Sequence, residues 1–281
     1  MRIKVSEAIG FCFGVRDAVA LSKKVLSDKR GGIFSVGPII HNPQVARELS
    51  RMGLVTVKDA SSIKKGTVII SSHGAGGGLL SKKEKGLKVV DATCPFVKKI
   101  QRVVADLCKK GYGVVIVGKR EHPEVKALVD LTGGRASVVK DAGQARGLRI
   151  RSSRIGVVSQ STYSRKVFRE VTAVLAHKDI TELRIFNTIC SDTIRRQDAV
   201  RRLAESVDAV LVVGGKNSSN TRRLVEVCRA AGKTAYHIED SADIGPSWCY
   251  GKKRIGVASG ASTPDWVVDG VIQRIRRNRS R

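Results

Sequence analysis

Three cysteines occupy matching positions in the sequence, each at the end of an extended segment and just before a helical pattern. Cys12 lies in GFCFGV, Cys94 in DATCPFV and Cys190 in NTICSDT. Any one buried cysteine is most often structural, but single cysteines that meet at one point could hold zinc or an iron–sulfur cluster. The absence of a CxxC pair argues against a zinc ribbon. Three thiolates leave one metal position open, which is what a catalytic metal needs to bind a substrate oxygen.

The other three cysteines follow a different pattern. Cys108 and Cys228 lie within helical patterns, and Cys249 precedes a loop in SWCYG. We expect all three to be small, buried, apolar side chains of the core.

Three of the five histidines lie in loop turns: His41 in GPIIHNPQV, His73 in SSHGAGG and His122 in REHPEV. An imidazole in such a turn could bind a metal, transfer a proton or donate a hydrogen bond to a phosphate, and a structural role for each one alone stays open. Glu124 follows His122 across a proline, and a carboxyl group beside an imidazole in a pocket suits proton delivery. His177 and His237 are expected to be structural.

Hydroxyl and amide groups gather in turns that follow apolar strands. GGKNSSNTRR at 214–223 brings Ser218, Ser219 and Asn220 to a helix start, where they could bind an anion or only cap the helix. The turns SQSTYS and SGASTPDW, which contain Ser161 and Ser262, follow strands in the same way. Neither a P-loop nor a GxGxxG fingerprint is present, so ATP and NAD are not indicated. Together these residues indicate an enzyme that acts on a small phosphate-bearing substrate.

The elements that must position these residues read as alternating strands and helices. Short apolar segments rich in Val and Ile each end in a small or polar turn and precede a helical pattern, as in 67–77, 112–125, 154–164, 207–224 and 254–267. This alternation is typical of βαβ units with parallel sheets, which hold ligands at the carboxyl ends of their strands.

Internal similarities predict about three such units. RIGVVSQST resembles RIGVASGAST, LKVVDATCP resembles LRIFNTICS, and ADLCKKGYGVVIVGK resembles VEVCRAAGKTAYHIE. We expect a first α/β unit at 1–94 that carries the N-terminal cysteine segment. A second is expected at 95–190, and a third at 191–281 with a basic C-terminal tail.

The composition is that of a globular protein with an unusually basic surface. The chain of 281 residues is 42% hydrophobic and carries a formal net charge of +27, but only 4% of its residues are aromatic. The charge could favour nucleic acid, yet the basic residues are spread along the chain and few rings could stack on bases. No apolar run is long enough for a membrane span, and the polar N-terminus does not resemble a signal peptide. We therefore expect a cytoplasmic protein that does not bind a membrane or specific nucleic acid.

The ordered motifs GFCFGV, GPIIHNPQV, SSHG, DATCP, HPEV, VVGGKNSSN and GASTPDW closely resemble the 4-hydroxy-3-methylbut-2-enyl diphosphate reductase (LytB) family, from residue 1 to about 275. The resemblance implies a trefoil of three α/β domains around a central [4Fe–4S] cluster. Cys12, Cys94 and Cys190 would be its ligands, and the fourth iron, which such clusters lose readily to give [3Fe–4S], would be open to substrate. The implied reaction is the last step of the methylerythritol phosphate route to isoprenoids. In it, two electrons and two protons remove an allylic hydroxyl to give isopentenyl and dimethylallyl diphosphates plus water.

The resemblance also implies roles for the site residues. Glu124 would be the proton source, with His122 and a hydroxyl relay beside it. The family usually has Gln-Thr-Thr where this chain has Gln160-Ser161-Thr162, so the relay would fall on Ser161, with Thr162 and Thr193 as alternatives. The residues expected to bind substrate are His41, His73, His122, Glu124, Ser161, Thr162, Thr193, Ser218, Ser219, Asn220 and Ser262.

An acidic ferredoxin or flavodoxin as electron donor would suit the basic surface. Two other functions stay open at this stage. One is a nucleic-acid-binding protein with an inactive or regulatory cluster, and the other is a three-cysteine hydro-lyase that eliminates water without net electron transfer.

Overall fold

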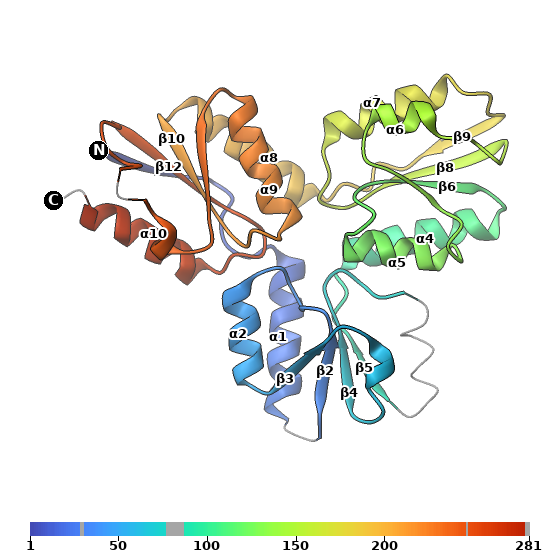
Figure 1. The fold of residues 1–281 in the computed structure, drawn as a ribbon, viewed down its shortest axis with the longest axis horizontal. Coiled ribbons are helices and arrows are strands. Elements are labelled where there is room, and N and C mark those ends of the chain that lie inside the picture. Colours follow the sequence, from blue (N-terminus) through green and yellow to red (C-terminus); the bar gives the residue numbers. More distant parts are fainter. Residues whose placement is uncertain (29–30, 77–86, 246, 279–281) are drawn as a thin grey trace. The chain divides into compact units, whose positions relative to one another are not determined.

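The computed structural model describes residues 1–28, 31–76, 87–245 and 247–278. Within these ranges the chain forms three four-stranded sheets, and every strand pair is parallel (Figure 1). The expected fold class of three parallel-sheet α/β units is therefore confirmed. Across the described ranges, every helix falls short of the length and apolar character that a membrane span requires.

The chain divides into two compact units. Unit 1 contains Met1–Arg16, Ile40–Glu48 and Ser191–Arg281, and unit 2 contains Asp17–Ile39 and Leu49–Cys190. Sheet A belongs to unit 1, whereas sheets B and C belong to unit 2.

Sheet A has the strand order β1-β12-β10-β11. Its strands are β1 (Arg2–Val5), β12 (Arg254–Ser259), β10 (Ala209–Val213) and β11 (Thr234–Ile238). Its helices are α8 (Ser191–Glu205), α9 (Ser219–Ala230) and α10 (Asp265–Asn278), with a 3₁₀ turn η3 at Ser241–Asp243. Every residue of β10 is buried, because α8 and α9 contribute to one apolar cluster and α10 to another. Burial on both faces explains why this strand is a continuous apolar run.

Sheet B has the order β3-β2-β4-β5. Its strands are β3 (Leu54–Val57), β2 (Ile33–Val36), β4 (Thr67–Ile70) and β5 (Lys88–Asp91). The neighbouring elements in the sequence are α1 (Phe13–Ser27), α2 (Pro43–Arg51) and the 3₁₀ turn η1 (Ala60–Ser62).

Sheet C has the order β7-β6-β8-β9. Its strands are β7 (Ser137–Val139), β6 (Gly113–Val117), β8 (Arg154–Ser159) and β9 (Glu182–Ile185). Its helices are α4 (Pro95–Lys109), α5 (Pro123–Leu131), α6 (Ala142–Gly147) and α7 (Arg165–Ala176). Helices α4 and α5 cover one face of the sheet, and α6 and α7 cover the other (Figure 1).

The three sheets repeat one topology, and each cysteine of the matching set lies where the chain leaves a sheet. Each sheet has one edge strand that leads to a cysteine of this set. These strands are β1, β5 and β9, which lead to Cys12, Cys94 and Cys190. The helices that follow these cysteines are α1, α4 and α8. The structure thus confirms that the three cysteines occupy equivalent positions at strand-to-helix turns.

This topology changes one feature of the expected units. The strand Arg2–Val5 pairs with β12 in sheet A, not with a strand of the 1–94 unit. The reason is that sheet A needs a fourth strand, and the N-terminus supplies it. The limits near 94 and 190 stay a prediction.

Two of the three internal similarities match equivalent strands. The RIGV segments form β8 and β12, and their glycines let a helix approach the sheet closely. A Cβ on Gly156 would lie 2.4 Å from the Leu107 side chain of α4, and one on Gly256 would lie 3.1–3.2 Å from Val207 and Leu203. The third similarity does not match equivalent strands. It aligns β6, an inner strand of sheet C, with β11, an edge strand of sheet A.

Candidate functional site

The strongest chemical feature of unit 2 is a buried carboxyl group held by the turn after β8. The Ser161 hydroxyl donates a hydrogen bond of 2.6 Å to Glu124 Oε2, and the Ser161 N–H donates one of 2.6 Å to Oε1. Glu124 is 1% exposed and lies in the first turn of α5. Two hydrogen bonds therefore fix both oxygens of one carboxyl group.

The environment of Glu124 favours its protonated form. Burial raises the pKa of its carboxyl group to about 7, although the two hydrogen bonds from Ser161 lower it. Desolvation outweighs the hydrogen bonds because a buried carboxylate loses its water shell on all sides. A carboxyl group with a pKa near neutrality is suited to act as a general acid.

His122 and His73 lie in the same unit as Glu124, and His122 precedes Glu124 by two residues. His122 caps the N-terminus of α5, where its Nδ1 accepts a hydrogen bond of 3.3 Å from the Glu124 N–H. The proline at the next position fits this helix start, since proline has no N–H to leave unsatisfied. The rings of His73 and His122 meet edge to face with centroids 5.5 Å apart. The structure thus brings three predicted site residues of unit 2 together.

Two of the three cysteines are joined to these loops by their backbones. The Cys94 N–H donates to the Ser72 carbonyl over 3.1 Å, and the Cys190 N–H donates to the Ser161 carbonyl over 2.9 Å. Cys94 is the N-cap residue of α4, preceding Pro95. Burial raises the pKa of the Cys94 thiol, hydrogen bonds from the Phe96 and Val97 N–H groups lower it, and the charge of Glu124 raises it. The helix start therefore offers N–H groups to this sulfur.

Cys12 lies in unit 1, on the loop between β1 and α1. Its N–H donates to the Ala261 carbonyl over 3.0 Å, and the Gly10 N–H donates to Ser259 Oγ over 3.0 Å. Gly10 has a φ of 71°, and a Cβ there would collide with the Asp265 carboxyl group. The loop that carries Cys12 is thus bound closely to the turn after β12, and its convergence with the other two cysteines stays a prediction.

The turn after β10 holds the predicted anion-binding group of unit 1. Ser218 is the N-cap residue of α9, where its Oγ accepts from the Thr221 N–H over 3.3 Å, and Ser219 and Asn220 form the first turn. All three residues are buried. The side-chain amide of Asn220 has no hydrogen-bond partner for either of its polar atoms among the described residues. Buried amides normally have hydrogen-bond partners, and a ligand could supply the partners that this one lacks.

His41 and Ser262 join this group through the backbone. Ser262 Oγ donates to the His41 carbonyl over 3.2 Å. Gly215, in the turn before α9, approaches the same carbonyl so closely that a Cβ would lie 2.6 Å from it. Burial lowers the pKa of the His41 imidazole, and the charge of Arg222 lowers it further. The imidazole is therefore neutral at pH 7 in the absence of an anion.

The structure distinguishes the three candidates for the hydroxyl relay. Ser161 contacts Glu124 directly, whereas Thr162 Oγ1 accepts a hydrogen bond of 2.9 Å from the Gln160 side chain. Thr193 is buried in the first turn of α8 and belongs to unit 1, so its part in a relay stays a prediction.

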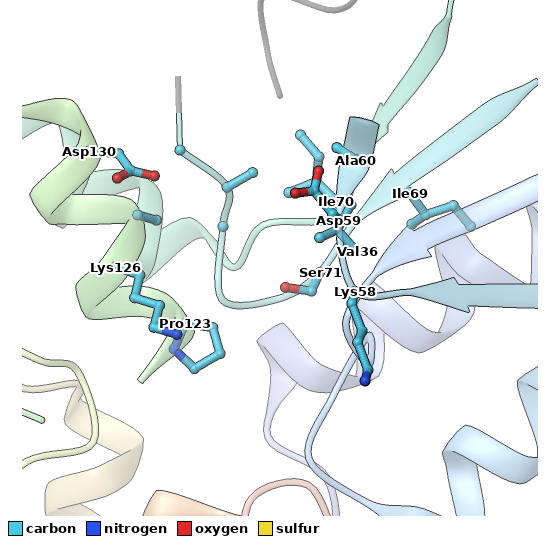
Figure 2. A pocket seen from close by; sticks show the side chains of 14 residues that line it. Val36, Lys58, Asp59, Ala60, Ile69, Ile70, Ser71, Pro123, Lys126 and Asp130 are labelled. Atoms are coloured by element: carbon cyan, nitrogen blue, oxygen red, sulfur yellow. The ribbon is translucent and has the colours of Figure 1, made fainter. Parts of the chain in front are cut away.

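A cavity of about 350 Å³ adjoins the histidine loops of unit 2 and was not anticipated from the sequence. Figure 2 shows its walls, with Pro123, Lys126 and Asp130 of α5 on one side and Ser71 and Lys58 on the other. Pro123 follows His122, and Ser71 Oγ accepts from the His73 N–H over 3.3 Å. The cavity thus shares its walls with the loops that carry the predicted residues.

Two further buried polar residues, one in a turn and one in a helix, were not expected from the sequence. Gln160 is fully buried and accepts a hydrogen bond from the Lys119 N–H, which ties the turn after β8 to the turn after β6. Arg196 of α8 is 1% exposed. The i,i+4 spacing of Asp192 and Arg196 was the one available signal, but this spacing is common on exposed helix faces.

A family model and curated relatives match nearly the whole chain. The model of the family described as "LytB protein" matches residues 3–276. A 4-hydroxy-3-methylbut-2-enyl diphosphate reductase of Pelobacter propionicus is 44% identical over 277 residues, which cover 98% of each chain. The reductase of Aquifex aeolicus is 40% identical over 285 residues, which cover 98% of this chain and 96% of the relative.

Two solved structures are similar over nearly the whole chain. One is a structure of (E)-4-hydroxy-3-methyl-but-2-enyl diphosphate reductase, described as the terminal enzyme of the non-mevalonate pathway. It has 39% identity, a TM-score of 0.68, and coverage of 99% of this chain and all of that one. The other, a reductase from Plasmodium falciparum, has 24% identity and a TM-score of 0.91 over 97% of this chain and 87% of that one, and it supports the fold alone.

Proposed function

This chain belongs to the LytB protein family, and we propose that it is a 4-hydroxy-3-methylbut-2-enyl diphosphate reductase. The reaction takes up two electrons and two protons. The allylic C–O bond breaks, the oxygen leaves as water, and a C–H bond forms to give isopentenyl or dimethylallyl diphosphate. Relatives that carry this name match 98% of the chain.

The observation that carries the proposal is the hydrogen-bonded pair of Glu124 and Ser161. The carboxyl group has a pKa of about 7, so a large fraction of it carries a proton at neutral pH. Ser161 Oγ is bonded to Glu124 Oε2, so this hydroxyl can take a proton from Glu124 while it donates its own. The pair therefore supplies a buried proton path that ends at Ser161 Oγ, where the leaving oxygen would accept it.

The family uses an iron–sulfur cluster, and we propose that Cys12, Cys94 and Cys190 hold a [4Fe–4S] cluster with one open iron. The donor set fits this group, since all three are cysteines outside disulfide bonds and lie at strand-to-helix turns. Cys94 is also the N-cap residue of α4, where the positive end of the helix dipole favours a thiolate. When bound, the cluster would supply the electrons and a Lewis-acidic iron for the hydroxyl oxygen.

We propose that the diphosphate is bound by the polar side chains of Ser218, Ser219, Asn220, Ser262, His41, His73 and His122. The unpartnered amide of Asn220 supports this assignment, because buried polar atoms without partners are costly unless a ligand satisfies them. A bound diphosphate would also favour the protonated form of His41 and so strengthen its own binding.

The electron donor is proposed to be an acidic one-electron carrier of the ferredoxin or flavodoxin type in the cytoplasm. The net charge of +27 supports this choice, because complementary fields increase encounter rates. Such steering falls with ionic strength, so the rate with an acidic protein donor should decrease with added salt. A small uncharged reductant should not show that dependence.

Anaerobic turnover of the purified chain tests the proposed function. The chain is reconstituted with iron and sulfide, and the substrate is supplied with and without a one-electron reductant. We expect iron-dependent and reductant-dependent formation of the two C5 diphosphates, separated by chromatography. Loss of water without any reductant would instead identify a hydro-lyase, and nucleic-acid binding without turnover would identify a binding protein.

A further inference from the structure

One arginine is buried within unit 1 next to the loop that carries Cys12. Arg196 is the only lysine or arginine classed as buried among the described residues, although the chain contains 52 such residues in all. Taking a guanidinium group out of water is costly unless its N–H groups are well bonded. Its surroundings therefore have to supply several acceptors.

Those acceptors come from three different segments of unit 1. Arg196 Nε donates to Asp192 Oδ2 over 2.6 Å, one turn earlier on α8. Its Nη1 donates to the Ala8 carbonyl over 3.2 Å and to the Ser259 carbonyl over 3.4 Å. The guanidinium group thus joins α8 to the loop after β1 and to the end of β12.

The two carbonyls belong to the segments that hold Cys12. Ala8 lies in the loop that leads from β1 to Cys12, and Ser259 is the residue whose Oγ accepts from the Gly10 N–H. Two residues after Ser259, the Ala261 carbonyl accepts from the Cys12 N–H. Arg196 therefore binds both segments that position the Cys12 backbone, namely the loop after β1 and the end of β12.

We infer that Arg196 is a positioning residue that holds the Cys12 loop against the turn after β12 and so presents the Cys12 thiol. The inference rests on the proposed function, in which Cys12 is a cluster ligand. Asp192 orients the guanidinium group from the first turn of α8, the helix that begins directly after Cys190. A buried ion pair is seldom more stabilising than well-packed apolar side chains, so a geometric task accounts better for its presence here.

The test measures the alkylation rate of individual cysteines in the chain without iron. Wild type, Arg196→Met and Arg196→Lys are treated with iodoacetamide, and each cysteine is followed by mass spectrometry. Cys228 reports on unfolding of the same unit, because it is a buried residue of α9 within the apolar cluster that α8 and α9 form with β10. The matched control is Arg195→Met, since Arg195 also pairs with Asp192 but its side chain is 65% exposed.

We expect Cys12 to react at least about tenfold faster in Arg196→Met, because two carbonyls of the turn lose their common donor. Arg196→Lys should show a smaller increase, because an ammonium group lacks the planar fork that reaches several acceptors at once. The rate at Cys228 should stay at the wild-type value in both variants, and Arg195→Met should match wild type at both cysteines.

Unchanged Cys12 reactivity in both Arg196 variants would overturn the inference, as would a parallel increase at Cys12 and Cys228 in Arg196→Lys. If Arg196→Met unfolds, Cys228 will show it, and the lysine variant then decides. A second measurement counts iron per chain after anaerobic reconstitution, which should fall in Arg196→Met and persist in Arg195→Met. A wild-type chain that binds no iron would contradict the proposed function, while the alkylation result would still decide the role of Arg196.

Discussion

The Ser161 hydroxyl donates a hydrogen bond of 2.6 Å to Oε2 of Glu124, and the N–H of the same serine donates to Oε1. These bonds oppose the effect of burial, which raises the pKa of the Glu124 carboxyl group to about 7. The carboxyl group is therefore held in a fixed orientation with its pKa raised toward neutrality.

Replacement of Glu124 by glutamine should leave the fold intact and reduce turnover strongly. The amide has a similar shape but cannot deliver a proton, and positioned proton transfer contributes about 10²- to 10⁴-fold to rate. The measurement is single-turnover product formation on chains matched for iron content. Glu121→Gln is the control, because Glu121 is exposed one residue before His122. A wild-type rate in Glu124→Gln would remove Glu124 from the proton path.

The turnover number should depend on pH through the same group. A proton donor with a pKa of about 7 is protonated below neutrality, so kcat should fall about tenfold per pH unit above that value. Ser161→Ala removes a hydrogen bond that favours the carboxylate, so it should shift the fall to higher pH while lowering the maximal rate. Ser161→Thr keeps the hydroxyl and should leave the profile in place. A pH profile of Ser161→Ala identical to that of wild type would contradict the hydrogen bond between Ser161 and Glu124.

Stability should decrease between about pH 4.5 and pH 7. The pKa of Glu124 is raised from 4.5 to about 7, so in this window the folded chain binds a proton that the unfolded chain has released. Stability is therefore highest below the unfolded value and falls as pH rises, by about 3 kcal/mol from this group. Urea unfolding of wild type and Glu124→Gln at several pH values measures the free energy of unfolding. The glutamine variant should lack the decrease that Glu124 causes between pH 4.5 and pH 7.

Asn220 and Ser218 should respond differently to replacement by alanine. Asn220 has no partner for its amide among the described residues, so Asn220→Ala should raise KM at least about tenfold with little change in the free energy of unfolding. Ser218 caps α9 and is also proposed to bind the diphosphate, so Ser218→Ala should cost about 0.5–2 kcal/mol of stability in addition to raising KM. Thermal unfolding and steady-state kinetics separate the two effects. A strongly destabilised Asn220→Ala with normal KM would contradict a ligand role.

Cys94 and Cys108 lie at opposite ends of α4, so they provide a matched pair of positions for a test of iron binding. Cys94 is the N-cap residue of α4, and Cys108 lies near its C-terminus. Cys94→Ser should lose most of the bound iron, because a serine hydroxyl is a poor ligand for a cluster iron. Cys108→Ser should keep it. Equal iron content in the two variants would contradict the assignment of Cys94.

Much of the fold could be predicted from the sequence because its signals are local. Continuous Val- and Ile-rich segments, each followed by a turn and a helical pattern, indicated parallel sheets buried on both faces. The RIGV segments correctly marked equivalent strands, since Gly156 and Gly256 both lie where a helix packs closely on its sheet.

Pairings between distant segments could not be predicted in the same way. Nothing local in Arg2–Val5 shows that this strand completes sheet A beside β12. The false similarity of β6 and β11 arose because a helix, a glycine and an apolar strand follow one another in every unit. Burial of Arg196 depends on carbonyls from residues 8 and 259, far away in the sequence, so its role became visible only in three dimensions.

The most direct test of reductive dehydroxylation is the isotope and electron balance of one turnover. The reaction is run in D₂O with a titrated one-electron reductant, and the C5 diphosphates are analysed by mass spectrometry. Our account predicts two electrons consumed per product and one solvent-derived deuterium in a new C–D bond, with the hydroxyl oxygen lost as water. Water loss without electron consumption, or electron consumption with the hydroxyl retained, would contradict it.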